Sequence, residues 1–239
     1  ALRLLRHLQA AVGDGVESFE LIPASALELV LTHIAGTRAP LTTALPWHVL
    51  VEIVAPVAAP SPDKYVHAAL HSALEIGIAQ DAAIAASEAQ AEDFWRLRES
   101  ISEAEKKDGP AAKHDISVAV PDMPAFMEEA AAKVEAHYPG TRVNAFGHLG
   151  DGNVHFNVRA PIGATAAWVE AEGAAVSALV HDLVTAAGGS ISAEHGIGQM
   201  KRDELARLGG AARIGALQAV KRAMDPHNIM NPGKLVPGI

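Results

Sequence analysis

The sequence contains no cysteine among its 239 residues. This absence excludes disulfide bonds, thiolate metal ligands and cysteine nucleophiles together, and a reducing, cytoplasmic setting is consistent with it. Long apolar runs are also absent, since the most apolar stretch, residues 48–60, is interrupted by Glu52 and Pro56. A membrane-spanning helix needs about 18 or more such residues, so none is expected. The chain does not begin with the pattern of a secretory signal.

Positive charge is scarce. The chain has 19 Lys and Arg residues against 28 Asp and Glu residues, which gives a net charge of −9. Lys and Arg never occur in a run longer than a pair. Nucleic acids and anionic membrane surfaces attract proteins through clustered basic side chains. We therefore expect neither as a partner.

Apolar residues are abundant, at 49% of the chain, with 20% charged residues and a mean hydropathy of +0.15. A chain of this composition folds into a globular structure, and its length predicts one large domain or two modest ones. The 48 alanines favour helices. The 12 histidines are many for an acidic chain and need a separate explanation.

Helical and extended patterns follow one another along the chain. Ser61 followed by Pro62, and Ser87 followed by Gln90, have the spacing of helix starts. The periodicity predicts strands over 18–22, 47–54, 78–85 and 115–120. It predicts helices over 2–12, 23–31, 61–77, 87–107 and 165–187, one that begins at Asp122 and a last one that ends at Asp225. A hairpin is expected between the helix that begins at Asp122 and the helix over 165–187. This mixed order predicts an α+β fold, with helices layered on a largely antiparallel sheet and a C-terminal helical segment.

The hairpin segment TRVNAFGHLGDGNVHFNVR, residues 141–159, is the most informative stretch. Asp151-Gly152 is typical of a two-residue type I′ turn. If these two residues form the turn, His148 lies directly opposite His155, on the polar face of the hairpin. The other face of the hairpin is then apolar.

Two facing imidazoles suit Zn²⁺ or another divalent transition metal. Glu194, in the glycine-flanked loop ISAEHGIG, is a candidate third ligand, and His195 beside it could remain unligated. The alternative is that both histidines simply occupy a solvated sheet face. The opposed arrangement favours the metal site over this alternative.

Three motifs occur in a characteristic order: GHLGDGNVHFNV (147–158), SAEHGIGQMKR (192–202) and DPHNIMNPGK (225–234). With the weaker segments WRLRESISEA and KHDISV, they resemble the C-terminal part of FAD-linked oxidases of the vanillyl-alcohol oxidase superfamily. Within it the chain is most similar to the D-2-hydroxyacid dehydrogenases, a group that includes D-2-hydroxyglutarate dehydrogenase, D-lactate dehydrogenase and the glycolate oxidase D subunit. The resemblance covers essentially the whole chain and implies a ferredoxin-like sheet.

The resemblance implies that a 2-hydroxy acid loses its C2 hydride to FAD and becomes a 2-oxo acid. It assigns each role to particular positions of this sequence. His195 is the implied base, and the divalent metal, Zn- or Mn-like, falls to His148, His155 and Glu194. The positions implied to bind substrate are Arg98, Ser102, Lys113 and Asn157, and those near the flavin are Gly196 and Asn231. Ser102 stands where some members have threonine, which also supplies a hydroxyl.

Some of these residues also have simpler interpretations. Arg98 could pair with Glu99 or Glu103 on an exposed helix face. Lys113, at the entrance of a strand, could be solvated, and the segment 225–234 could be a plain helix terminator. These alternatives stay open on the sequence alone.

The N-terminal FAD-binding domain of the family has no counterpart in this chain, so we expect a piece of a longer protein. Within it we expect a substrate or cap domain over 1–190 and a C-terminal segment over 191–239 that packs towards the flavin. Two other functions remain: a zinc-dependent hydrolase with the same ligands, and a non-catalytic binding module that has lost its flavin domain.

The expected partners are a small 2-hydroxy acid and an unidentified electron acceptor. We expect no transmembrane segment and a cytoplasmic location. Peripheral membrane association is an alternative to that location, and a homodimer is an alternative to a monomer.

Overall fold

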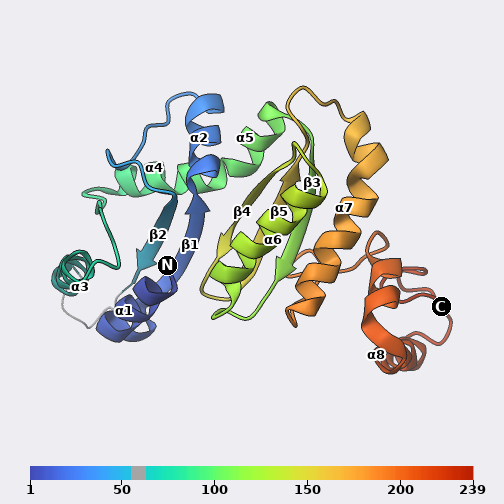
Figure 1. Ribbon diagram of the computed structural model, residues 1–239. Coiled ribbons are helices and arrows are strands. Elements are labelled where there is room, and N and C mark those ends of the chain that lie inside the picture. The colour runs from blue at the N-terminus through green and yellow to red at the C-terminus, as the bar shows by residue number, and fades with distance from the viewer. Residues whose placement is uncertain (55–62, 239) are drawn as a thin grey trace.

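The computed structural model describes residues 1–54 and 63–238 (Figure 1). The strands are β1 (Val16–Pro23), β2 (Trp47–Ile53), β3 (Ala111–Ser117), β4 (Arg142–His148) and β5 (Asn153–Arg159). The helices are α1 (Leu2–Val12), α2 (Ala24–His33), α3 (Asp63–Glu75), α4 (Glu88–Glu99), α5 (Ile101–Asp108), α6 (Met123–His137), α7 (Ala167–Ala186) and α8 (Arg202–Met224), with a short 3-10 turn, η1 (Gly13–Gly15). The expected helix start at Ser61 and Pro62 lies outside the described residues.

All five strands form one antiparallel sheet in the order β2-β1-β4-β5-β3. After α7 the chain returns to the free edge of β3, where Ser190 forms a single antiparallel bridge with Ser117. The strands from β3 onwards, with α6 and α7 as connections, therefore have the ferredoxin-like order. The α+β prediction is confirmed.

The sheet buries apolar side chains on both faces. On one face the core contains residues of α1, α6 and α7, and Figure 1 shows α6 lying across β4 and β5. On the other face, a smaller core joins Phe146 of β4 to α2, α4 and α5. Its members are Ile22, Ala26, Leu29, Val30, Ile34, Leu97, Ile101, Ala104 and Phe146. This second core covers only part of its face, so neighbouring polar side chains can reach the surface.

The hairpin register differs from the predicted one by two residues. His148 is opposite Asn153, and His155 is opposite Phe146. The turn is longer than expected because Leu149 leaves the ladder, is fully buried, and donates its N–H to the Phe19 carbonyl at 2.9 Å. Since side chains alternate with a period of two, this shift keeps both histidines on one face.

Three other expectations need correction. Residues 78–85 form no strand: Asp81 bonds there to its neighbour Ala82 N and to Thr43, and such local bonds compete with strand pairing. The helix expected over 87–107 is divided at Ser100, which ends α4 and precedes α5. The β-branched residues of 47–54 predict a buried strand, but β2 lies at a sheet edge and is half-buried.

The hairpin turn supplies a stability test. Gly152 has a φ of +83°, and an added methyl group would meet the Val118 carbonyl oxygen. Gly152→Ala should therefore lower the free energy of unfolding by about 2–4 kcal/mol, measured by denaturant titration. Gly150→Ala, two residues away and with open space around it, should change it by less than about 1 kcal/mol. Equal effects of the two substitutions would contradict this account of the turn.

Candidate functional site

Polar side chains from four strands meet on the face that the second core leaves partly open. The strand pairing places Glu20 of β1 opposite His148 of β4, and Asp115 of β3 opposite His155 of β5. Opposed residues in an antiparallel sheet lie within side-chain contact. Strands that are far apart in the sequence thus assemble one row of ionisable groups across the sheet.

Glu20 anchors one end of this row. Its carboxylate, 2% exposed, accepts hydrogen bonds from Arg98 Nε at 2.6 Å and from His148 Nδ1 at 2.5 Å. Burial alone would raise the pKa of the Glu20 carboxyl, but the bond from His148 and the Arg98 charge hold it below its usual value. The bond to Glu20 also raises the pKa of His148. Arg98 therefore pairs with Glu20, and not with the helix neighbours Glu99 or Glu103.

His155 lies beside this anchor. Its ring centroid is 5.7 Å from that of His148 and 5.1 Å from that of Phe146, and the Arg98 guanidinium stacks 4.9 Å above the Phe146 ring. Burial lowers the pKa of His155, as do the charges of Arg98 and His148. The imidazole is therefore held in its neutral form, which is the form that binds metals.

The predicted metal ligands are only partly assembled. Within residues 1–54 and 63–238, no three His, Asp or Glu side chains form a group that could hold a metal ion. Two observations nevertheless fit a cation. The bond from His148 Nδ1 to Glu20 leaves Nε2 of the neutral ring with a lone pair that can bind a metal, as in many metal sites. Among the described residues, the buried Asp115 Oδ1 has no hydrogen-bond partner.

The loop that carries Glu194 and His195 is attached to Asp115. The Asp115 carboxylate accepts the backbone N–H groups of Glu194 at 2.9 Å and His195 at 2.8 Å. Both side chains of the loop residues are exposed, and the His195 side chain is 69% exposed. The implied base thus stands at the rim of the site, where a substrate could reach it.

A second buried carboxylate, that of Glu105, lies further along the same face. It accepts the side-chain amides of Asn144 at 2.8 Å and Asn157 at 2.7 Å and the Lys113 ammonium at 3.2 Å. The structure therefore brings Lys113 and Asn157 together, although Asn157 is buried and bonded to protein. Ser102, on the exposed side of α5, is not part of this group.

The two expected flavin contacts belong to neighbouring segments. Gly196 has a φ of +74° and Asn231 a φ of +49°, and both are exposed. The N–H of Leu235 donates to the Gly198 carbonyl at 2.7 Å, which joins the C-terminal tail to the Gly196–Gly198 loop. The structure thus places the two segments side by side.

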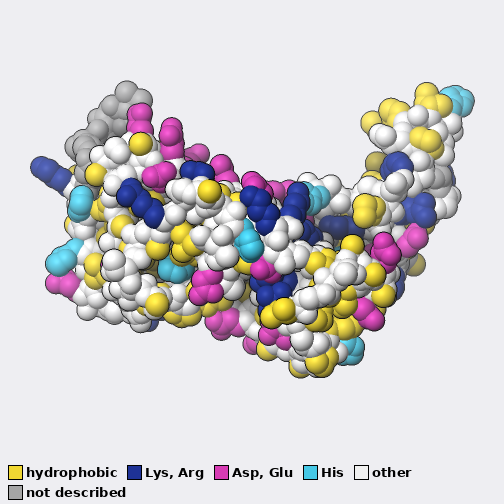
Figure 2. Space-filling model, turned by 90° about the horizontal axis from the view of Figure 1, so that it is seen from above, with side chains coloured by type: hydrophobic (Ala, Val, Ile, Leu, Met, Phe, Trp, Pro, Cys, Tyr) yellow, Lys and Arg dark blue, Asp and Glu magenta, His cyan; other side chains and the backbone are white. Residues whose placement is uncertain are grey.

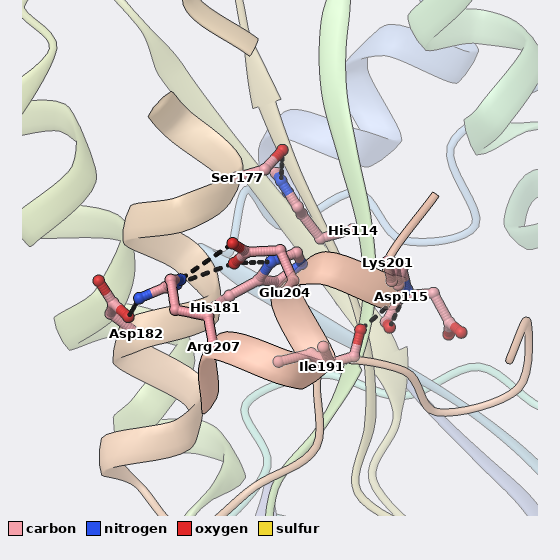
Figure 3. A network of polar contacts seen from close by, with 9 residues as sticks. All are labelled: His114, Asp115, Ser177, His181, Asp182, Ile191, Lys201, Glu204 and Arg207. Atoms are coloured by element: carbon pink, nitrogen blue, oxygen red, sulfur yellow. Dashed lines mark hydrogen bonds and ion pairs between the residues drawn. The ribbon is translucent and has the colours of Figure 1, made fainter. Parts of the chain in front are cut away.

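Helix α8 is held to the body by a polar network on the opposite side of β3 (Figure 3). Glu204 accepts from His181 Nδ1 at 3.0 Å and from Arg207, which also bonds to Asp182 at 2.6 Å. The bond from Arg207 lowers the pKa of Glu204 to about 2. Nearby His114 lies between the Phe156 carbonyl and Ser177, and burial lowers its pKa to about 4. These contacts explain part of the histidine excess as structural.

Sequence reasoning missed the three buried carboxylates, of Glu20, Glu105 and Asp115. A signal was present for Glu20, which interrupts the apolar run FELIP, and for Asp115, which lies in an otherwise alternating strand. Glu105 gave no such signal, because it sits on a helix rich in charged residues. A charged residue inside an apolar strand is seldom buried without a partner.

The fold and this face define an α+β domain that carries a site of paired imidazole, carboxylate and guanidinium groups. The model of the family described as "FAD linked oxidases, C-terminal domain" matches residues 1–235. The chain belongs to this family.

Curated relatives are similar over nearly the whole chain. A D-2-hydroxyglutarate dehydrogenase of Xanthomonas citri pv. viticola is 40% identical over 220 residues, 92% of this chain and 46% of that protein. One of Stutzerimonas stutzeri is 38% identical over 218 residues, 91% of this chain and 46% of that protein. The mitochondrial D-2-hydroxyglutarate dehydrogenase of Arabidopsis thaliana is 31% identical over 235 residues, 98% of this chain and 40% of that protein.

The chain spans about half the length of the curated relatives it matches. In its described part, none of the helices combines the length and the apolar character needed to cross a membrane.

The pairing of Glu20 with His148 gives a pH-dependent prediction for the metal-free protein. Because the folded pKa of His148 is raised, the pair's stabilisation is present below the ordinary imidazole pKa and is lost as pH rises through the raised value. It is also lost as pH falls through the lowered pKa of Glu20. Glu20→Gln should lower the pKa of His148, measured by NMR titration, and reduce the free energy of unfolding by about 3 kcal/mol.

Glu28→Gln, on the exposed side of α2, is the matched control and should leave both quantities near their starting values. An unchanged His148 pKa in Glu20→Gln would refute the assigned hydrogen bond.

Proposed function

We propose that this chain is the substrate-binding and metal-binding C-terminal part of an FAD-dependent D-2-hydroxyacid dehydrogenase. The reaction converts a 2-hydroxy acid to a 2-oxo acid: the C2–H bond breaks with its electron pair, the hydroxyl loses a proton, and a C=O double bond forms. The observation that carries the proposal is the exposed His195 held by Asp115, the strand partner of His155, in a chain of the FAD-linked oxidase family.

His195 is the base in this proposal and takes the hydroxyl proton. A general base must reach the proton that it takes, and the exposed His195 imidazole is open to a substrate. When bound, FAD would supply the acceptor for the electron pair and hydrogen of the C2–H bond. Removing the proton as the hydride leaves avoids building charge on the substrate.

Arg98 and Lys113 supply the positive charge that a carboxylate substrate needs. The Arg98 bond to Glu20 uses Nε, so the guanidinium keeps further N–H donors for a ligand. Lys113, with 37% of its side chain exposed, keeps donors as well. Ser102 adds a hydroxyl from α5. Asn157 is bonded to Glu105, the same carboxylate that Lys113 contacts, and so supports the position of Lys113.

A divalent cation, Zn- or Mn-like, is also part of the proposal, with His148, His155 and Glu194 as its ligands. Support comes from the neighbouring rings, the Glu20 bond to His148 and the unpartnered Asp115 oxygen. Such an ion would lower the pKa of the substrate hydroxyl and make its proton easier to remove.

We propose that the chain acts together with an FAD domain, which docks on the C-terminal segment. We divide the chain into a substrate domain over 1–190 and a flavin-facing segment over 191–239. Figure 2 shows this end of the molecule rising as an arm beside a hollow. Large apolar side chains are exposed along the segment: Met200, Val220, Met224, Ile229, Met230 and Leu235. Apolar exposure of this extent is typical of a covered surface, and Gly196 and Asn231 lie in it.

D-2-Hydroxyglutarate is the proposed substrate, because the relatives bear that enzyme's name and because two cations suit a dicarboxylate. The compartment is proposed to be cytoplasmic for this chain, although plant and animal relatives are named as mitochondrial. We further propose that the full-length protein passes its electrons to a separate acceptor and that it can form a homodimer.

Anaerobic mixing tests the reaction. The full-length protein should show FAD reduction on addition of D-2-hydroxyglutarate, and His195→Gln should slow it about 10²- to 10⁴-fold with FAD still bound, because the base is lost. His137→Gln, exposed on α6, is the control and should react at the normal rate. Absence of flavin reduction by D-2-hydroxyglutarate, D-lactate and glycolate alike would refute the proposal.

Elemental analysis tests the cation. The full-length protein should contain about one divalent ion per chain. His148→Ala or His155→Ala should remove this ion, because each substitution leaves only two of the three protein ligands. Glu20→Gln should weaken binding about 10- to 100-fold, since the His148 ring loses its orienting partner. His137→Ala should retain the metal. Unchanged metal content in both ligand variants would exclude the assigned site.

A further inference from the structure

Residues 191–201 form a loop that begins and ends at one residue of the sheet, Asp115. At one end the Asp115 carbonyl accepts the N–H of Ala193 at 3.3 Å. At the other end Lys201 Nζ donates to the Ile191 carbonyl at 2.8 Å and approaches the Asp115 carbonyl at 3.4 Å. Figure 3 shows Lys201 and Ile191 beside Asp115. The backbone of one strand residue therefore receives both ends of the loop.

The Asp115 side chain holds the middle of the same loop. One oxygen, Oδ2, accepts two consecutive backbone N–H groups, those of Glu194 and His195. The side chain is 2% exposed, so these bonds are shielded from water. A carboxylate oxygen is a strong acceptor for both N–H groups.

The same oxygen faces the ring of His195. Nδ1 of that ring lies 3.7 Å from Asp115 Oδ2, just beyond hydrogen-bond distance. The strand pairing also places Asp115 opposite His155. One buried side chain therefore touches the loop and neighbours the imidazole pair.

We propose that Asp115 is the positioning residue of the site, whose carboxylate oxygen holds Glu194 and His195 at the strand position opposite His155. It acts through these two residues and does not touch the substrate. The inference rests on the proposed role of His195 as base. The loop itself is exposed and rich in glycine, so without this anchor its residues would sample many arrangements.

Hydrogen exchange and kinetics of the full-length protein test the proposal together. In Asp115→Ala, exchange in peptides covering 191–201 should quicken about tenfold or more, while peptides of β4 and β5 stay protected. Turnover number, kcat, should fall about 100-fold, because the base is misplaced, while KM for D-2-hydroxyglutarate changes less than about threefold.

Asp115→Asn separates anchoring from folding, since its amide oxygen can accept the same two N–H groups. It should restore the protection of 191–201 and recover part of kcat. Asp122→Ala is the control, because the Asp122 side chain makes no capping bond to α6. Unchanged exchange of 191–201 in Asp115→Ala would overturn the proposal, and so would a loss of protection throughout the sheet in that variant. Exchange of 191–201 in Asp115→Asn that is as fast as in Asp115→Ala would overturn it as well. Exchange needs no turnover, so a failure of the dehydrogenase assay alone would refute the function and leave the anchor standing.

Discussion

Burying a carboxylate is costly unless hydrogen bonds or opposite charges replace the water that it loses. Three carboxylates are buried along one face of this sheet, and each has such partners: Glu20 with Arg98 and His148, Glu105 with two amides and Lys113, and Asp115 with two backbone N–H groups. These bonds determine where the ionisable groups of the site lie. The sheet supplies the spacing, and the carboxylates fix the orientation of the groups around them.

The local part of the fold could be predicted from the sequence. Helices such as α6, with its buried Phe126, Met127, Ala130 and Val134, follow from apolar spacing alone. The alternation of β5 likewise predicted which side chains share a face. The hairpin register could not be predicted, because Leu149 is drawn out of the β4–β5 ladder by a bond to Phe19, more than a hundred residues earlier. Turn chemistry is local, whereas this contact is not.

The candidate site divides in the same way. Motifs in the sequence pointed to His148, His155, Glu194 and His195, and the structure places the first two side by side and the other two on one anchored loop. The partners that orient them were missed, since they come from β1 and β3 and carry no motif of their own. Arg98 illustrates the point: its sequence neighbours offer two carboxylates, yet it pairs with Glu20, 78 residues away. Arg98 pairs with Glu20 because both side chains are buried together, and the spacing of residues along a helix does not predict such burial.

The distance along the chain between Asp115 and the loop that it holds has a consequence for biosynthesis. A chain leaves the ribosome from its N-terminus, and domains begin to fold as they emerge. Strands β1 to β5 and the Glu20–His148 pair are complete by residue 159, whereas Glu194 and His195 reach Asp115 only after α7 has been made and has packed. Contacts across so many residues form late, because the intervening chain must be ordered first. The nascent protein thus acquires its sheet and the Glu20–His148 half of its site well before Glu194 and His195, the residues of the anchored loop, leave the ribosome.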